Sequence, residues 1–190
     1  MTDDFYKKKR PDGDEHNPMS EPRFAEIATF MRAPLVESLD NVDIGLIGVP
    51  TDLGVTNRPG ARHGPREIRN SSSLMRTFNL GMNINPYKLC HIADLGDVSF
   101  SQRYDLEKQV EEIESFYQKI IEKNIFPISA GGDHSITYPI LKAIGKNEPV
   151  GMVHVDAHTD TWGEIWGSKF THGAPFKLAV EAGVLDPKRT

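Results

Sequence analysis

The sequence contains a single cysteine, Cys90, among its 190 residues. One cysteine cannot form an internal disulfide bond, so we expect a reducing compartment, by default the cytoplasm, and metal ligands drawn from histidine and carboxylate. No apolar run approaches the roughly 20 residues that cross a bilayer, and no signal-peptide-like apolar segment lies near the N-terminus. Excess positive charge is also missing, since the formal net charge is -5. We therefore expect neither a membrane nor a nucleic acid as partner.

The first 22 residues differ in composition from the rest of the chain. They are polar, rich in proline and charge, and include the basic cluster Lys7 to Arg10. Such a segment buries too little apolar surface to order itself. Residues 1–22 are therefore predicted to be an arm, with its basic cluster in solvent, and residues 23–190 to form the folded part.

Short apolar runs alternate with helical patterns along that part. Strands are predicted at 43–50, 90–98, 125–132 and 149–156, and helices at 64–76, 105–124 and 137–144. The helix at 105–124 has the clearest period, with apolar residues recurring at three and four. Strands that alternate with helices, without tight hairpin signals between them, indicate an α/β fold with a parallel sheet.

Polar clusters follow the last two predicted strands. Gly131 and Gly132 end the third run and His134 follows it, while Asp156 ends the fourth run and His158 and Asp160 follow it. Because carboxyl ends of parallel strands meet at one edge of the sheet, the clusters are predicted to lie together. If the backbone stays extended through 156–160, alternation places the last three side chains on one face.

This donor set favours a metal site. A single aspartate or histidine at a strand end is more often a cap or a satisfied polar group. Three at strict two-residue spacing, with a Gly-Gly-Asp-His motif upstream, favour ligands instead, and imidazole with several carboxylates suits a manganese-like ion. A two-metal centre would want about six protein ligands, so the four residues found are too few for it.

Several motifs resemble the ureohydrolases, the arginase and agmatinase superfamily. They are GGDHS at 131–135, DAHTD at 156–160, THGAPF at 171–176 and GVPTDLGVTNRPGARHGPREIR at 48–69. The resemblance implies a three-layer arginase-like fold, incomplete at the C-terminus, of which residues 23–190 form the N-terminal portion. It also implies a trimer or hexamer for a full-length chain.

The resemblance also implies a site and a reaction. His134, Asp156 and Asp160 would bind one divalent ion, Asp156 and His158 a second, with manganese expected over nickel. A metal-bridging hydroxide, oriented by Asp160, would convert a guanidino compound to urea and an amine or ammonia, and His172 would carry protons. The family's later S-F-D-x-D-x-x-D-P motif and downstream glutamate are not in this sequence.

The substrate is less sharply indicated. Trp162 stands where arginases have an asparagine that holds the substrate's amino-acid end, which disfavours arginine. Trp162, Glu164 and Trp166 either line a pocket for a small or cationic substrate or, in the case of the tryptophans, pack beneath the loop. Agmatine, guanidinobutyrate, guanidinopropionate and guanidine stay open, with a slight inclination to guanidine.

Two alternatives accompany the enzyme hypothesis. One is a truncated, non-catalytic or split-chain fragment that needs a partner, and the other is a formimino-compound hydrolase on the same fold. Of the remaining polar residues, His154 is interpreted as an outer partner of the site or a satisfied core histidine. Structural roles are expected for His63, His91, Arg62 and Arg66.

Overall fold

The computed structural model describes residues 22–190, so the predicted arm lies outside the described residues except for Pro22. The described elements are the strands β1 (Ile44–Val49), β2 (Ile92–Asp97) and β3 (Phe126–Gly131), the helices α1 (Gly64–Ser72), α2 (Leu106–Glu122), α3 (Thr137–Ile144) and α4 (Pro175–Glu181), and the 3-10 turns η2 (Phe30–Arg32), η3 (Ala61–His63), η4 (Pro86–Lys88) and η5 (His134–Ile136). None of the described helices combines the length and apolarity needed to cross a bilayer.

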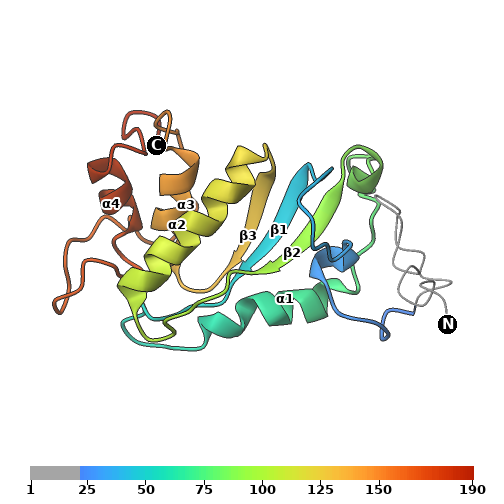
Figure 1. Ribbon diagram of the computed structural model, residues 1–190, viewed down its shortest axis with the longest axis horizontal. Coiled ribbons are helices and arrows are strands. Elements are labelled where there is room, and N and C mark those ends of the chain that lie inside the picture. The colour runs from blue at the N-terminus through green and yellow to red at the C-terminus, as the bar shows by residue number, and fades with distance from the viewer. Residues whose placement is uncertain (1–21) are drawn as a thin grey trace.

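The sheet is parallel, as predicted, with strand order β2-β1-β3 (Figure 1). β1 is the central strand, and Ile44 at its start lies opposite both Ile92 and Phe126. Five of its six residues are buried. An apolar strand buried on both faces is typical of a parallel sheet covered by helices.

Alternation along β1 builds one core on each face of the sheet. Ile47 and Val49 pack in a cluster with Tyr117 of α2 and Ala143 of α3. Leu46 points the other way and packs with Phe30 of η2. Figure 1 shows the resulting layers, with α2 and α3 on one side of the sheet and α1 on the other.

Two predicted helices are confirmed almost to the residue. Asp105 caps α2, because its side chain accepts a hydrogen bond from the backbone N–H of Lys108. Gly145 follows α3 and donates to the carbonyl of Leu141. The helix predicted at 64–76 is shorter than expected and ends at Ser72, and the short helix α4 was not predicted.

The fourth predicted strand, at 149–156, is not formed among the described residues. In the described chain, the segment makes one isolated parallel β-bridge, between Val150 and Leu185. Val153 and Val155 are 92% and 94% exposed. A strand requires a neighbour to bond its backbone. Within the described chain, β3 also has β1 as its sole sheet neighbour, so its other edge is unpaired.

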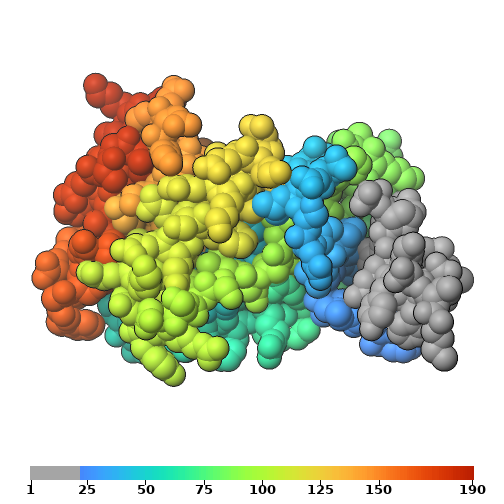
Figure 2. Space-filling view, viewed as in Figure 1, coloured from blue at the N-terminus to red at the C-terminus, as the bar shows by residue number. Residues whose placement is uncertain are grey.

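A separate small hydrophobic core joins the C-terminal part of the described chain to α3. Leu141 of α3 packs there with Phe176 and Ala179 of α4 and with Val184 and Leu185. Figures 1 and 2 show this orange and red part at the opposite end of the molecule from the blue segment that includes η2. The C-terminal residues are thus anchored on α3.

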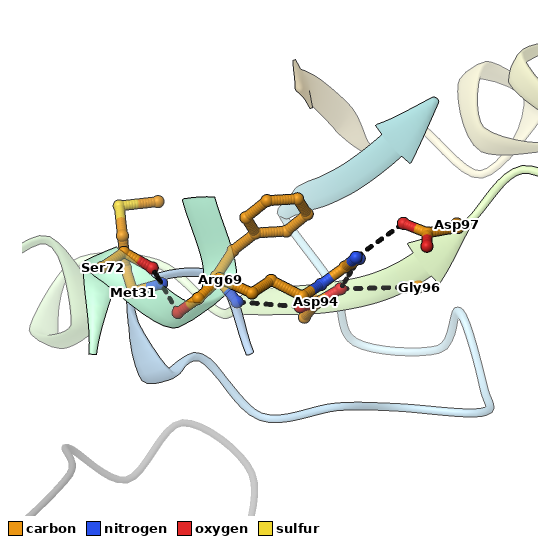
Figure 3. A network of polar contacts seen from close by, with 7 residues as sticks. Met31, Arg69, Ser72, Asp94, Gly96 and Asp97 are labelled. Carbon is orange, nitrogen blue, oxygen red and sulfur yellow. Dashed lines mark hydrogen bonds and ion pairs between the residues drawn. The ribbon is translucent and has the colours of Figure 1, made fainter. Parts of the chain in front are cut away.

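A buried ion pair fixes the opposite face of the sheet (Figure 3). Arg69 of α1 donates from Nε and Nη2 to the two carboxylate oxygens of Asp94, at 2.8 and 2.9 Å, and from Nη1 to Asp97 at 2.6 Å. Its guanidinium also lies 4.0 Å from the ring centre of Phe30. Asp94 is fully buried and accepts further bonds from the backbone N–H groups of Phe30 and Gly96. One side chain therefore joins α1, β2 and η2.

A second carboxylate orders the loop after β1. The buried side chain of Asp52 accepts hydrogen bonds from the backbone N–H groups of Gly60 and Arg62 and from the Arg62 guanidinium. The guanidinium bond, followed by the backbone bonds, lowers the pKa of Asp52 below its ordinary value. Arg62 thus pins this loop, as expected from the sequence.

We predict that removing the charge of either carboxylate that Arg69 contacts lowers the stability of the fold, but by unequal amounts. Asp94→Asn leaves a buried guanidinium without its paired charge and should destabilise the fold by about 3 to 5 kcal/mol. Asp97→Asn removes a partner that is 42% exposed and should cost less than about 1 kcal/mol. Urea denaturation of both variants measures the difference, and equal losses would contradict the role given to Asp94.

The Asp52 carboxylate should make stability depend on pH. The pKa of this carboxyl is lower in the folded state than in the unfolded state. Its contribution to the free energy of unfolding is therefore complete above the unfolded-state pKa and is lost as the pH falls through the folded-state pKa. Asp52→Asn should therefore be less stable than wild type at neutral pH, and the gap should close below about pH 4. Denaturation curves across that range test this, and a constant gap would argue against the ionised pair.

Candidate metal centre

The turn that carries His134 is built from backbone contacts with the loop after β1. Gly132 adopts a φ of 74°, and a Cβ there would lie 2.4 Å from the carbonyl oxygen of Val49. Asp133 is buried, and its oxygens accept hydrogen bonds from the backbone N–H of Ser135 at 2.7 Å and of Gly54 at 2.8 Å. The glycine in this motif thus permits both the turn and the close approach that place His134.

Three of the predicted ligands lie together. His134 Nδ1 is 2.5 Å from Asp160 Oδ2 and 3.5 Å from Asp156 Oδ2. Asp160 is buried and lies at a φ of 48°, in the left-handed region that non-glycine residues seldom adopt. The structure therefore joins the two polar clusters, which are more than 20 residues apart in sequence.

His154 adds a second imidazole to this group. Its buried Nε2 lies 3.4 Å from Asp156 Oδ2 and otherwise has no hydrogen-bond partner in the described chain. One donor atom each from His134, His154 and Asp156 falls within 4.8 Å of the others. The Phe176 ring packs edge-on against both imidazoles, with centroids 5.3 Å from His134 and 4.4 Å from His154.

The predicted row of ligands on one extended face is wrong for His158. The backbone bends at 156–158, where the N–H of His158 donates to Asp156 Oδ1 at 2.9 Å, and the His158 side chain is 80% exposed. Its Nδ1 is still 3.7 Å from Asp156 Oδ1. The backbone bond from His158, then the His154 and His134 side chains, lower the pKa of Asp156.

The other predicted site residues lie in the loops around 160–173. His172 is half-buried, with its Nε2 3.0 Å from Thr56 Oγ1 and its backbone N–H bonded to the carbonyl of Gly54. Trp162 donates its backbone N–H to Gly173 and lies beside it, yet its side chain is 62% exposed. Glu164 is exposed, as is Trp166 at 86%, so neither tryptophan is buried under the loop.

Three residues that shape the site were not assigned a role from the sequence. Asp133 and Phe176 lie inside the motifs GGDHS and THGAPF, so their position next to predicted ligands was an available signal. Thr56 carries no such signal, because its contact with His172 spans 116 positions of sequence. That contact depends on how the loops pack.

The imidazole and carboxylate donors of this group fit a divalent transition metal. They converge from two loops, are partly shielded from solvent, and include the otherwise unpaired Nε2 of His154. The arrangement is therefore a candidate metal-binding group.

Residues 42–190 match the arginase family. The chain is 50% identical over 170 residues to guanidinopropionase from Pseudomonas aeruginosa, covering 89% of this chain and 53% of that protein. It is 46% identical to the human mitochondrial guanidino acid hydrolase, covering 86% and 46%, and 45% identical to guanidinobutyrase from P. aeruginosa, covering 88% and 54%.

Solved structures give the same result. Proclavaminate amidino hydrolase from Streptomyces clavuligerus superposes with a TM-score of 0.85 at 33% identity, covering 89% of this chain and 56% of that one. Formiminoglutamase from Trypanosoma cruzi, solved with Mn2+, superposes with a TM-score of 0.72 at 28% identity, covering 81% and 52%. The chain thus spans about half the length of the relatives it matches. Its sequence and its fold show that the chain belongs to the arginase family.

Proposed function

We propose that the protein hydrolyses a guanidino compound to urea and an amine with the help of two divalent metal ions. The observation that carries this proposal is the convergence of His134, Asp156 and Asp160 at one edge of the sheet. Sequence identities of 45 to 50% to proteins named guanidinopropionase, guanidino acid hydrolase and guanidinobutyrase support the reaction class.

In this proposal His134, Asp156 and Asp160 hold one ion, and Asp156 and His158 hold the other. A set rich in carboxylate favours manganese over nickel. Bound ions supply Lewis acidity, which makes a water molecule nucleophilic near neutral pH and stabilises negative charge on the reacting carbon's substituents. The remaining ligands would come from a segment corresponding to the part of the relatives that this chain does not span.

The reaction needs a nucleophile in position and a proton on the leaving nitrogen. Water adds its oxygen to the guanidinium carbon, the bond from that carbon to the leaving nitrogen breaks, and both water protons end on the amine. Asp160 accepts a hydrogen bond from the attacking water and orients it. His172 passes a proton to the leaving nitrogen, a role that suits an imidazole at neutral pH.

Among the candidate substrates we favour a guanidino acid. Guanidinopropionate, guanidinobutyrate, agmatine and free guanidine all present the same reacting group, but the relatives just named are guanidino acid enzymes. Trp162 is a candidate substrate contact, because its exposed ring lies beside Gly173, next to His172. Its aromatic face and the Glu164 carboxylate can both attract a guanidinium.

Metal binding is predicted to depend on Asp156 and not on a carboxylate with the same local geometry. Asp156 and Asp186 are matched, because their side chains are 27% and 30% exposed and each accepts the backbone N–H of the residue two positions later, both at 2.9 Å. Asp156→Asn should weaken Mn2+ binding by more than the roughly 10- to 100-fold typical of losing an outer partner of a ligand. Asp186→Asn should bind as wild type does in calorimetric titration, and equal effects would reject the ligand assignment.

Urea release is the predicted activity of the protein in the length that its native source produces. With Mn2+ present, guanidinopropionate or guanidinobutyrate should give the highest kcat/KM, above agmatine and guanidine, and Asp160→Asn should lower kcat by about a hundredfold or more. Assaying formamide release from formimino compounds in parallel tests the related activity for which the T. cruzi structure is named. Absence of urea from every guanidino compound would refute the proposed function.

A further inference from the structure

The loop after β1 contacts His172 at two points, two residues apart. The backbone N–H of His172 donates to the carbonyl of Gly54 at 3.0 Å, and its ring Nε2 lies 3.0 Å from the hydroxyl oxygen of Thr56. The first contact fixes the backbone of His172 and the second fixes its imidazole. The loop and His172 are more than a hundred residues apart in sequence, so both contacts depend on the tertiary fold.

The same loop is tied to the turn that carries His134. The N–H of Gly54 donates to the buried carboxylate of Asp133, whose own N–H donates to the carbonyl of Thr51. A Cβ at Gly54 would lie 2.9 Å from the Cβ of Ser135, so the two segments are in close contact. Residues 51–56 therefore connect the turn that carries His134 with His172.

We propose that Thr56 is a positioning residue for His172, holding its imidazole by a hydrogen bond at Nε2 so that Nδ1 is the nitrogen that exchanges a proton. The proposal rests on the proton-transfer role given to His172 in the proposed function. A neutral imidazole has one N–H and one acceptor nitrogen. A hydroxyl can donate or accept, so the contact fits both tautomers. The proposal assigns the one in which Nε2–H donates to the Thr56 oxygen, because it leaves the Nδ1 lone pair to take up and release a proton. The same bond keeps the ring from turning over.

Two substitutions separate this role from ordinary packing. Thr56→Val keeps the shape of the side chain and removes the hydroxyl, whereas Thr56→Ser keeps the hydroxyl. Ser38→Ala is the control, since the Ser38 hydroxyl also makes an exposed hydrogen bond, at 2.9 Å to Asp40, in a remote loop. A merely structural threonine would affect stability but leave the His172 tautomer unchanged.

The direct readout is the nitrogen NMR spectrum of histidine side chains. The protein in its native length is labelled with 15N-histidine, loaded with diamagnetic Zn2+ and studied well above the ordinary histidine pKa, with the His172 signals assigned by His172→Gln. Wild type, Thr56→Ser and Ser38→Ala should show one tautomer at His172, and Thr56→Val a mixture of two. The same His172 spectrum in Thr56→Val and wild type would overturn the proposal.

The kinetic readout connects the tautomer to proton transfer. Thr56→Val should lower kcat for urea release by about tenfold, a part of the 100-fold or greater contribution of a general acid, with KM nearly unchanged. Thr56→Ser should restore kcat to within about twofold. An unchanged kcat in Thr56→Val would also overturn the proposal. If wild type releases no urea the proposed function fails, and the spectrum still decides whether Thr56 holds His172.

Discussion

The structure depends on the parallel pairing of β1 with strands on both its edges. Because β3 runs in the same direction as β1, the loops that follow these strands leave the sheet at the same edge. There they bond to each other through Thr51, Gly54 and Asp133. The position of His134 is thus set by the register of two strands, and on the far side of the sheet the Arg69 and Asp94 ion pair keeps α1 in place against them.

Much of the fold was predictable because its signals are local. The α2 helix has an apolar period of several turns and an aspartate at its start, and α3 ends at a glycine. The three paired strands are short apolar runs between turn residues. The meeting of His134 with Asp156 and Asp160 was also predicted and is present, although the strand expected before Asp156 is not formed in the described chain.

The structural predictions failed where the local structure depends on residues distant in sequence. The run at 149–156 is as apolar as the strands, but pairing needs a neighbour, and the described chain offers one bridge at Val150. The predicted row of ligands failed at His158, where the chain bends and the backbone N–H of His158 donates to the Asp156 carboxylate. The helix α4 has only seven residues, too few for a periodic pattern to be recognised, and the contact of Thr56 with His172 leaves no trace in sequence.

The chain spans about half the length of the relatives it matches, and its described part brings candidate metal ligands together. Donor atoms of His134, His154 and Asp156 lie close enough to one another to be candidates for holding an ion, Phe176 packs against both imidazoles, and Asp160 contacts His134.

The central claim is that His134, Asp156, His158 and Asp160 together hold two metal ions. Anomalous diffraction at the manganese edge, from crystals of the native-length protein grown with Mn2+, tests it most directly. The account predicts two peaks roughly 3.5 to 4 Å apart, with Asp156 between them and His134 and His158 on opposite sides. Peaks at other residues, or a single ion that leaves His134 or Asp160 uncoordinated, would contradict it.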